Sequence, residues 1–185
     1  MEEYLLDPNI ITTERFSDMC SKELKNLLIE QWKTKISEGT SNNGQSNKLG
    51  FYSRLKTTFE MEPYLENVNN FYLRKYICKF RCSDHKLEIE TGRHRKVDIN
   101  SRICRICNSS IESEMHFLAI CPLYEPLRNR YFERKHEIDL INLLKCKNKT
   151  DAFNIGNFII KATKLRENTL KALETPVEAN QSLIN

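Results

Sequence analysis

Residues 102–122 of the chain, RICRICNSSIESEMHFLAICP, place three cysteines and one histidine within a short stretch. They follow the pattern Cys104-x2-Cys107-x8-His116-x4-Cys121. A CxxC pair on a tight turn directs two thiolates at one point, and thiolate and imidazole are ligands that favour zinc in tetrahedral geometry. Because protein side chains fill all four positions, the pattern predicts one closed, structural Zn²⁺ site rather than a catalytic one.

The stretch between the second cysteine and the histidine predicts how the site closes. NSSIESE is polar and suits a loop leading into a short helix, with His116 near its start and Cys121 just past its end. Residues five apart on an α-helix do not share a face, so a break at Pro122 is expected to turn Cys121 toward the metal. The alternative interpretation is a set of buried thiols beside a surface histidine.

The composition predicts a mostly helical protein. The chain has 185 residues with only five glycines and five prolines, too few for a turn-rich β-sandwich or barrel. No apolar run reaches the roughly 18 residues that span a bilayer, and the start MEEYLLDPNI is unlike a secretory signal. We therefore expect no membrane role, an intracellular location, nuclear or cytoplasmic, and reduced thiols.

The spacing of apolar residues divides the chain into six segments. Between Phe16 and Ile36 it is helical, which predicts an N-terminal amphipathic arm over residues 1–36 that can self-associate. Residues 37–48 are small and polar and predict a flexible linker. A helical basic segment, the CCHC zinc-binding module, C-terminal helices and a disordered tail are expected at residues 49–100, 101–134, 135–173 and 174–185. The predicted fold class is mainly α, a small helical domain built around the zinc knuckle.

Within the basic segment, the predicted secondary structure differs from one stretch to the next. Tyr52, Leu55 and Phe59 predict a short helix that ends near Pro63. In HKLEIETGRHRK, residues 85–96, apolar and polar residues alternate around Leu87, so helix and strand both stay open.

Positive charge is concentrated directly before the cysteine cluster. Residues 71–107 hold ten Lys and Arg against four acidic residues, a net charge of +6, whereas the whole chain carries +4. Basic side chains neutralise phosphates, so this segment favours RNA or DNA as a partner. The interleaved aromatic rings are expected to form mainly the buried side of a helix. The predicted nucleic-acid-binding residues are Arg74, Lys75, Lys79, Arg81, His85, Lys86, Arg93, Arg95, Lys96, Arg102 and Arg105.

Three stretches carry a resemblance to a known family. KLGFYSRLKTTFEMEPYL, LRKYICKFRCSDHKLEIETGR and RICRIC…EMHFLAICPLYEPLR resemble the zinc-binding region that follows the polymerase domain of LINE-like (non-LTR) retrotransposon reverse transcriptases. The most specific pieces are the KFR-x-S-x-H-x-L-x-I-E-x-G-R string and the CxxC…HxxxxCP knuckle, and the resemblance covers about residues 48–166. It implies zinc ligation by the four cluster residues and contact of template RNA or target DNA with the basic residues around positions 85–105.

The catalytic parts of a polymerase are missing from this sequence. No two of its six aspartates are adjacent, so no paired carboxylates hold two metal ions, and 185 residues are too few for fingers, palm and thumb. We therefore expect a zinc-stabilised nucleic-acid-binding module and not an enzyme. The alternatives are a zinc-stapled protein-interaction domain and, more remotely, a metal-dependent nuclease using Glu112 or Glu114.

Overall fold

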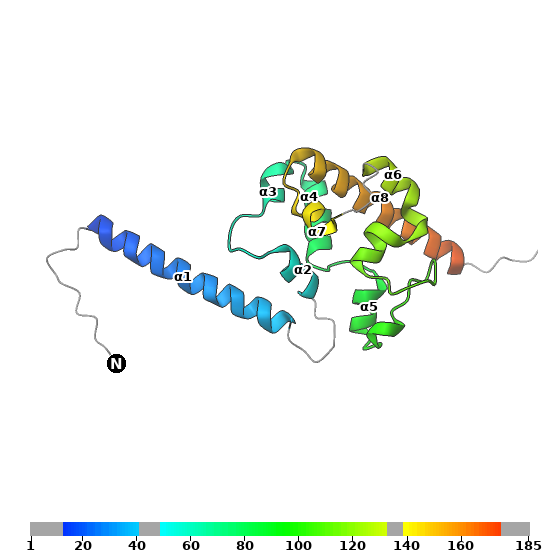
Figure 1. Cartoon of the computed structure of the whole chain (residues 1–185), viewed down its shortest axis with the longest axis horizontal. Helices are drawn as coiled ribbons and strands as arrows, with labels where there is room; N and C mark the ends of the chain where they lie inside the picture. The colour runs from blue at the N-terminus through cyan, green and yellow to red at the C-terminus, as the bar shows by residue number, and fades with distance from the viewer. Residues whose placement is uncertain (1–12, 41–48, 133–138, 175–185) are drawn as a thin grey trace, which may run out of the picture.

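The structure, a computed structural model, describes residues 13–40, 49–132 and 139–174 (Figure 1). These residues are mostly helical and include no strand, which confirms the predicted mainly α fold with its Cys/His cluster. No helix among them is both long and apolar enough to cross a membrane.

Eight α-helices make up the described part of the chain. The first five are α1 (Thr13–Thr40), α2 (Gly50–Leu55), α3 (Pro63–Asn67), α4 (Phe71–Arg81) and α5 (Glu88–His94). The last three are α6 (Glu125–Tyr131), α7 (Leu140–Lys145) and α8 (Lys149–Glu174). Short turns complete the set, with 3-10 helices at Ile99–Ser101 and Pro122–Tyr124 and a π-helix at His116–Ile120.

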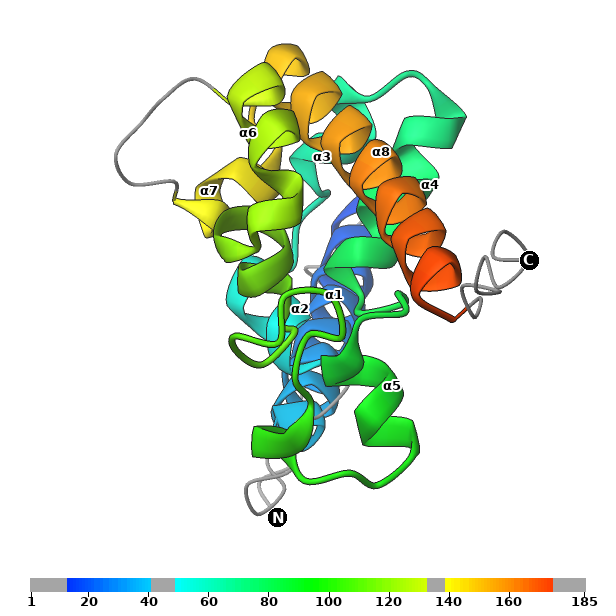
Figure 2. The same cartoon turned by 90° about the vertical axis from the view of Figure 1, so that its right-hand side faces the viewer.

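Helices α4 and α8 pack against each other and lie side by side in Figure 2. Ile77 of α4 and Ile155 of α8 are fully buried between them. The helices come close at Gly156, where an added Cβ would lie 3.1 Å from Cδ2 of Leu73. A larger residue there would push the two helices apart, so the glycine sets the depth of their contact.

Aromatic rings join the cysteine-rich segment to this helix pair. The ring of Phe117 lies 5.5 Å from that of Phe80 on α4, 4.7 Å from that of Tyr124 and 5.9 Å from that of Phe158 on α8. Such tilted and edge-on pairs add to the free energy gained by burying the rings. The cluster is therefore continuous with the main core rather than appended to it.

The segment at residues 85–96, whose sequence pattern fits both a helix and a strand, contains a helix. Residues Glu88–His94 form α5, with acidic side chains in the first turn and basic side chains in the last. This arrangement of charge suits the helix dipole. In the sequence, the alternation of Glu88 and Glu90 with apolar residues fits a strand. In the structure, these two glutamates lie in the first turn of α5.

The short helix expected from Tyr52 to near Pro63 was wrong in its extent. Helix α2 ends at Leu55, because Lys56 adopts an extended conformation, and α3 begins separately with Pro63 in its first turn. Phe59 does not continue the apolar face of α2, and its ring instead lies 5.8 Å from that of Trp32 on α1.

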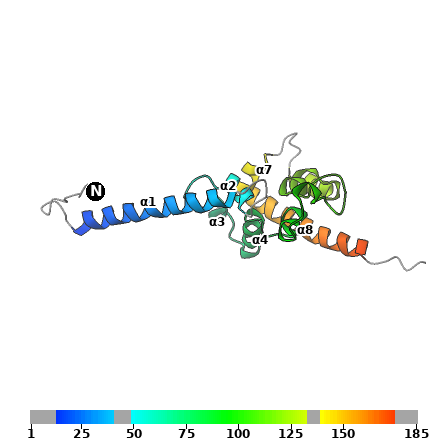
Figure 3. The ribbon, with the colours of Figure 1, turned by 90° about the horizontal axis from the view of Figure 1, so that it is seen from below.

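Helix α1 extends away from the body as an arm (Figures 1 and 3). It continues to Thr40, four residues beyond the predicted end at position 36. Residues 1–12 of the predicted arm, the remainder of the predicted linker and the predicted tail after Glu174 lie outside the described residues. Several large apolar side chains of the arm are exposed, including Leu24 at 59% and Leu27 at 54%.

Candidate metal centre

The first two cysteines of the cluster sit on a tight hairpin turn. Ile103 and Ile111 form an antiparallel bridge, and the amide of Cys104 donates to the carbonyl of Ser110 at 2.9 Å. The turn is closed by the amide of Asn108, which donates to the carbonyl of Cys104 at 2.9 Å. Asn108 has a φ of 53°, a left-handed conformation that asparagine tolerates well. The hairpin thus directs both CxxC thiols to one side.

The last two members are brought together by a π turn. The amide of Cys121 donates to the carbonyl of His116 at 2.8 Å, so the hydrogen bond spans five residues rather than four. This wider turn lets side chains five apart approach each other, as they do not on an α-helix. The expected break at Pro122 is present, since a 3-10 helix begins there. The closure itself comes from the π turn, which the spacing of the residues does not indicate.

The four predicted ligands meet in one group. The sulfurs of Cys104, Cys107 and Cys121 and a ring nitrogen of His116 all lie within 4.8 Å of one another. Cys107 Sγ lies 3.3 Å from Nε2 of His116. Cys107 is half-buried and the other three are buried. This arrangement can hold a metal ion. The alternative of buried thiols beside a surface histidine is wrong about the histidine, because His116 is 1% exposed and lies within the group.

Serine hydroxyls support two of the ligands. Ser110 Oγ lies 2.8 Å from Nδ1 of His116, which orients the ring so that Nε2 faces Cys107. Ser109 Oγ lies 3.1 Å from Cys107 Sγ. Partners of this kind fix the tautomer of a ligating histidine and stabilise a thiolate.

Burial and hydrogen bonds shift the pKa values of the four residues in the group. Burial raises the pKa of the Cys104 thiol to about 12 and also raises that of Cys121. Burial opposes ionisation of Cys107 too, but hydrogen bonds from Ser109 outweigh it and lower the pKa. Burial lowers the pKa of His116, which keeps the imidazole neutral and able to ligate. The raised pKa values favour the protonated thiols of Cys104 and Cys121, and a thiolate-binding metal would have to displace their protons to bind.

A buried ion pair connects the cysteine-rich segment, residues 102–122, which we call the knuckle, to helix α8. Arg166 of α8 donates from Nε and Nη2 to the two carboxylate oxygens of Glu112, each at 2.7 Å. The same carboxylate accepts from the amide of Glu88 at the start of α5, at 2.8 Å. Arg166 was missed from sequence, although it continues the buried stripe of α8 four residues after Ala162.

Glu114 makes a second connection. Its carboxylate accepts from Ser83 Oγ at 3.0 Å and lies 3.1 Å from Nε2 of His85. Burial raises the pKa of Glu114, but the hydrogen bonds of His85 and Ser83 outweigh it, so that the pKa is lowered. The two glutamates considered as nuclease bases, Glu112 and Glu114, are therefore both engaged in contacts that hold the knuckle in place.

Two of the predicted nucleic-acid-binding residues, Arg81 and Arg102, are buried, so the prediction is wrong for these two. Arg81 is 1% exposed and donates to the carbonyl of Leu144 and to Glu62. Arg102 is 4% exposed, lies against Gly92 and donates to the carbonyls of Val97 and Ile89. Both guanidinium groups serve buried acceptors, so neither belongs to a contact surface.

The other predicted contacts are at least partly accessible. Arg74, His85 and Arg93 are half-buried, and the exposed ones are Lys75, Lys79, Lys86, Arg95, Lys96 and Arg105. Several pair with acids, as Lys79 does with Asp84 at 3.3 Å. Arg93 pairs with Glu90, Arg95 with Glu88 and Arg105 with Glu174. Part of the local excess of positive charge is thus balanced within the fold.

Comparison with known proteins gives no match: no family model, no curated protein and no solved structure matches the chain. The resemblance to LINE-like reverse transcriptases therefore stays a prediction that rests on the quoted motifs. Several residues of its most specific string have structural partners here, Ser83 and His85 with Glu114, and Gly92 with Arg102.

Proposed function

We propose that the Cys3His group binds one Zn²⁺ with a structural role and that the domain binds single-stranded RNA or DNA. The zinc proposal rests on the donor set, because three thiolates and an imidazole suit zinc, and four protein ligands complete its tetrahedral shell. The ion would hold the knuckle closed and, through Glu112 and Glu114, fix the segment between α4 and α5.

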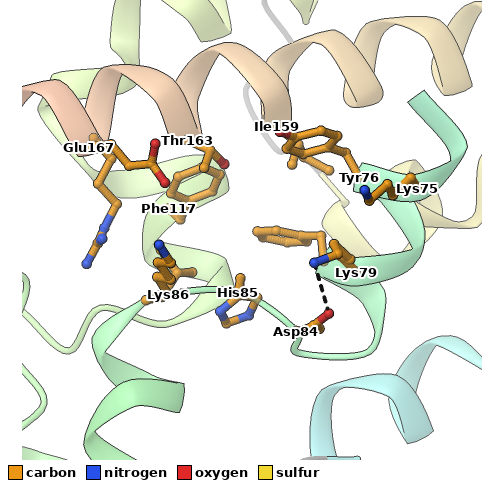
Figure 4. A pocket seen from close by; sticks show the side chains of 13 residues that line it. Lys75, Tyr76, Lys79, Asp84, His85, Lys86, Phe117, Ile159, Thr163 and Glu167 are labelled. Atoms are coloured by element: carbon orange, nitrogen blue, oxygen red, sulfur yellow. Dashed lines mark ion pairs between the residues drawn. The ribbon is translucent and has the colours of Figure 1, made fainter. Parts of the chain in front are cut away.

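The observation that carries the nucleic-acid proposal is a group of three exposed lysines. Lys75 and Lys79 of α4 and Lys86 of the following segment line one cavity (Figure 4). Lys75 and Lys86 form no ion pair with an acidic residue in the described part of the chain. A cluster of ammonium groups at one site releases counterions when it binds a phosphate backbone.

Salt-dependent binding tests this proposal. The affinity for a short fluorescent single strand is measured by anisotropy at several salt concentrations, for wild type and for a Lys75→Ala, Lys79→Ala, Lys86→Ala variant. Each phosphate contact to a single strand contributes about 0.7 to the slope of log affinity against log salt. The triple variant should therefore reduce the slope by about 2.

A control variant removes the same charge elsewhere, at Lys22, Lys25 and Lys35, three exposed residues of α1. It should keep the wild-type slope. Absence of binding to either RNA or DNA at low salt, with zinc-loaded and folded protein, would contradict the proposal.

A second candidate function is self-association, and the exposed apolar side chains of α1 favour it. The arm holds five acidic and five basic residues over positions 13–40, so a second copy meets no net repulsion. We propose that two copies pair their arms, which would bury the exposed residues Phe16, Met19, Leu24, Leu27 and Leu28.

A further inference from the structure

A cavity of about 240 Å³ lies between α4, α8 and the knuckle (Figure 4). Tyr76 and Phe80 line it from α4, Phe117 from the π turn, and Ile159 and Thr163 from α8. Its volume is below the roughly 300–1,000 Å³ of sites for drug-sized ligands. The space therefore suits one small ring rather than an extended ligand.

The interior of the cavity is mainly aromatic and aliphatic. The rings of Phe80 and Phe117 are 5.5 Å apart, and those of Phe80 and His85 are 5.2 Å apart. A flat, weakly polar ring gains most from such walls, through stacking and the burial of its faces. A small inorganic anion would make no use of them.

One residue of the wall, His85, also has an unsatisfied hydrogen-bonding atom. Nδ1 of His85 is buried without a partner, whereas Nε2 lies 3.1 Å from the carboxylate of Glu114. Because a carboxylate only accepts, this contact assigns a hydrogen to Nε2, and in the neutral tautomer that carries it Nδ1 is an acceptor. The exocyclic amine of a nucleobase is a donor of the kind that such an acceptor lacks.

The mouth of the cavity is charged. Lys75, Lys79 and Lys86 line it together with two acids, Asp84 and Glu167. Asp84 is engaged with Lys79 at 3.3 Å. An apolar interior beside a cluster of ammonium groups matches a nucleotide, in which a flat ring and an anionic phosphate are joined.

We propose that this cavity takes one unstacked base of a bound single strand, with the neighbouring phosphates at Lys75, Lys79 and Lys86. The inference rests on the proposed nucleic-acid function and adds to it a binding mode. A duplex, whose bases are stacked and paired, cannot present a base in this way without being opened. The domain should therefore prefer single strands.

The test compares an intact oligonucleotide with a fully abasic strand of the same length, which keeps the phosphates. Base stacking contributes about 1–3 kcal/mol per base, so wild type should bind the abasic strand roughly 5- to 150-fold more weakly. Thr163→Phe places a ring in the cavity. It should weaken binding of the intact strand by a similar factor and leave binding of the abasic strand unchanged.

Thr169→Phe is the matched control, because Thr169 is also half-buried on α8 but does not line the cavity. It should bind the intact strand like wild type. Zinc content and circular dichroism check that both variants are folded. If Thr163→Phe does not fold, ultraviolet cross-linking of wild type to the intact strand replaces it, and the cross-linked base should map to Tyr76 or Phe117.

The outcomes separate this inference from the function on which it rests. Strand binding that depends on the three lysines, but is equal for intact and abasic strands and for Thr163→Phe, would overturn the base pocket alone. Binding of adenosine monophosphate that Thr163→Phe abolishes, with strand binding unaffected, would assign the cavity to free nucleotides and overturn it as well. No binding of any strand would remove both proposals.

Discussion

His116 reaches the Cys/His cluster through two features that other residues provide. Ser110 fixes its ring from Nδ1, and the π turn places it beside Cys121, whose amide bonds to the His116 carbonyl at 2.8 Å. Cys104 and Cys107 depend less on such help, because the hairpin already directs them and Ser109 only adds a contact to Cys107. The supporting hydroxyl is therefore the part of the site most open to test by a single small substitution.

Replacing Ser110 by alanine should weaken zinc binding about 10- to 100-fold, because the ligating imidazole loses its orienting partner. Competition with a chromophoric chelator measures the change in affinity. Ser101→Ala is the control, since Ser101 is exposed and lies outside the cluster. Equal affinities for the two variants would show that the Ser110 hydroxyl does not position His116.

Replacing Cys107 by serine should abolish zinc binding, because it removes one of four ligands. Native mass spectrometry should find one zinc in wild type and none in the variant. Cys20→Ser, at an exposed cysteine of α1, should retain the zinc. A folded wild-type protein without zinc would refute the metal centre.

At the scale of the elements, the knuckle and α8 are held together by residues 54 positions apart in the chain. Glu112 and Arg166 are each less than 10% exposed, so their pair is shielded from water. Removal of one partner from a buried pair leaves an uncompensated charge, which costs more free energy than loss of the contact alone. The exposed pair of Arg105 with Glu174 joins the same two elements and provides a natural comparison.

Arg166→Met should lower the free energy of unfolding by about 3–5 kcal/mol, because Glu112 is left buried without its partner. Urea unfolding of the zinc-loaded protein measures the loss. Arg105→Ala should change it by about 0–1 kcal/mol. The variant that combines Arg166→Met with Glu112→Gln should lose less free energy of unfolding than the two single variants lose together. A loss equal to that sum would show that Glu112 and Arg166 are not coupled.

Self-association through α1 gives a further prediction at the scale of the elements. If two copies pair through α1, Leu24→Glu combined with Leu27→Glu should shift the protein to monomer, because charges would enter the apolar contact. Analytical ultracentrifugation over a range of concentrations measures the equilibrium. Glu23→Gln, at an exposed polar site of α1, should leave it unchanged. A monomeric wild type at high concentration would argue against pairing.

At the scale of the whole molecule, local patterns could be predicted from sequence and long-range pairings could not. The Cys-x2-Cys-x8-His-x4-Cys pattern is local, and it identified the four clustered residues. The inward direction of Arg81 depends on the Leu144 carbonyl, 63 residues away in the chain, which only the folded chain brings near. Charge in a sequence therefore located a basic segment without showing which of its guanidinium groups face water.

Zinc should stabilise the molecule unevenly. The ion would hold the knuckle, and the knuckle holds residues 83–88 through Glu112 and Glu114, whereas α1 packs against α2. Chelation should therefore speed amide hydrogen exchange in residues 83–90 and 102–121 and leave exchange in α1 unchanged. Hydrogen-exchange mass spectrometry with and without chelator measures this pattern.

The amount of chelator needed in this hydrogen-exchange experiment should fall as the pH is lowered. Burial raises the pKa of the Cys104 thiol to about 12, so zinc must displace a proton to bind there. Lowering the pH raises the cost of that displacement, so less chelator should be needed at pH 6 than at pH 8 to produce the fast-exchanging state. Uniform acceleration across α1 as well would mean that zinc supports the fold globally and not through the knuckle.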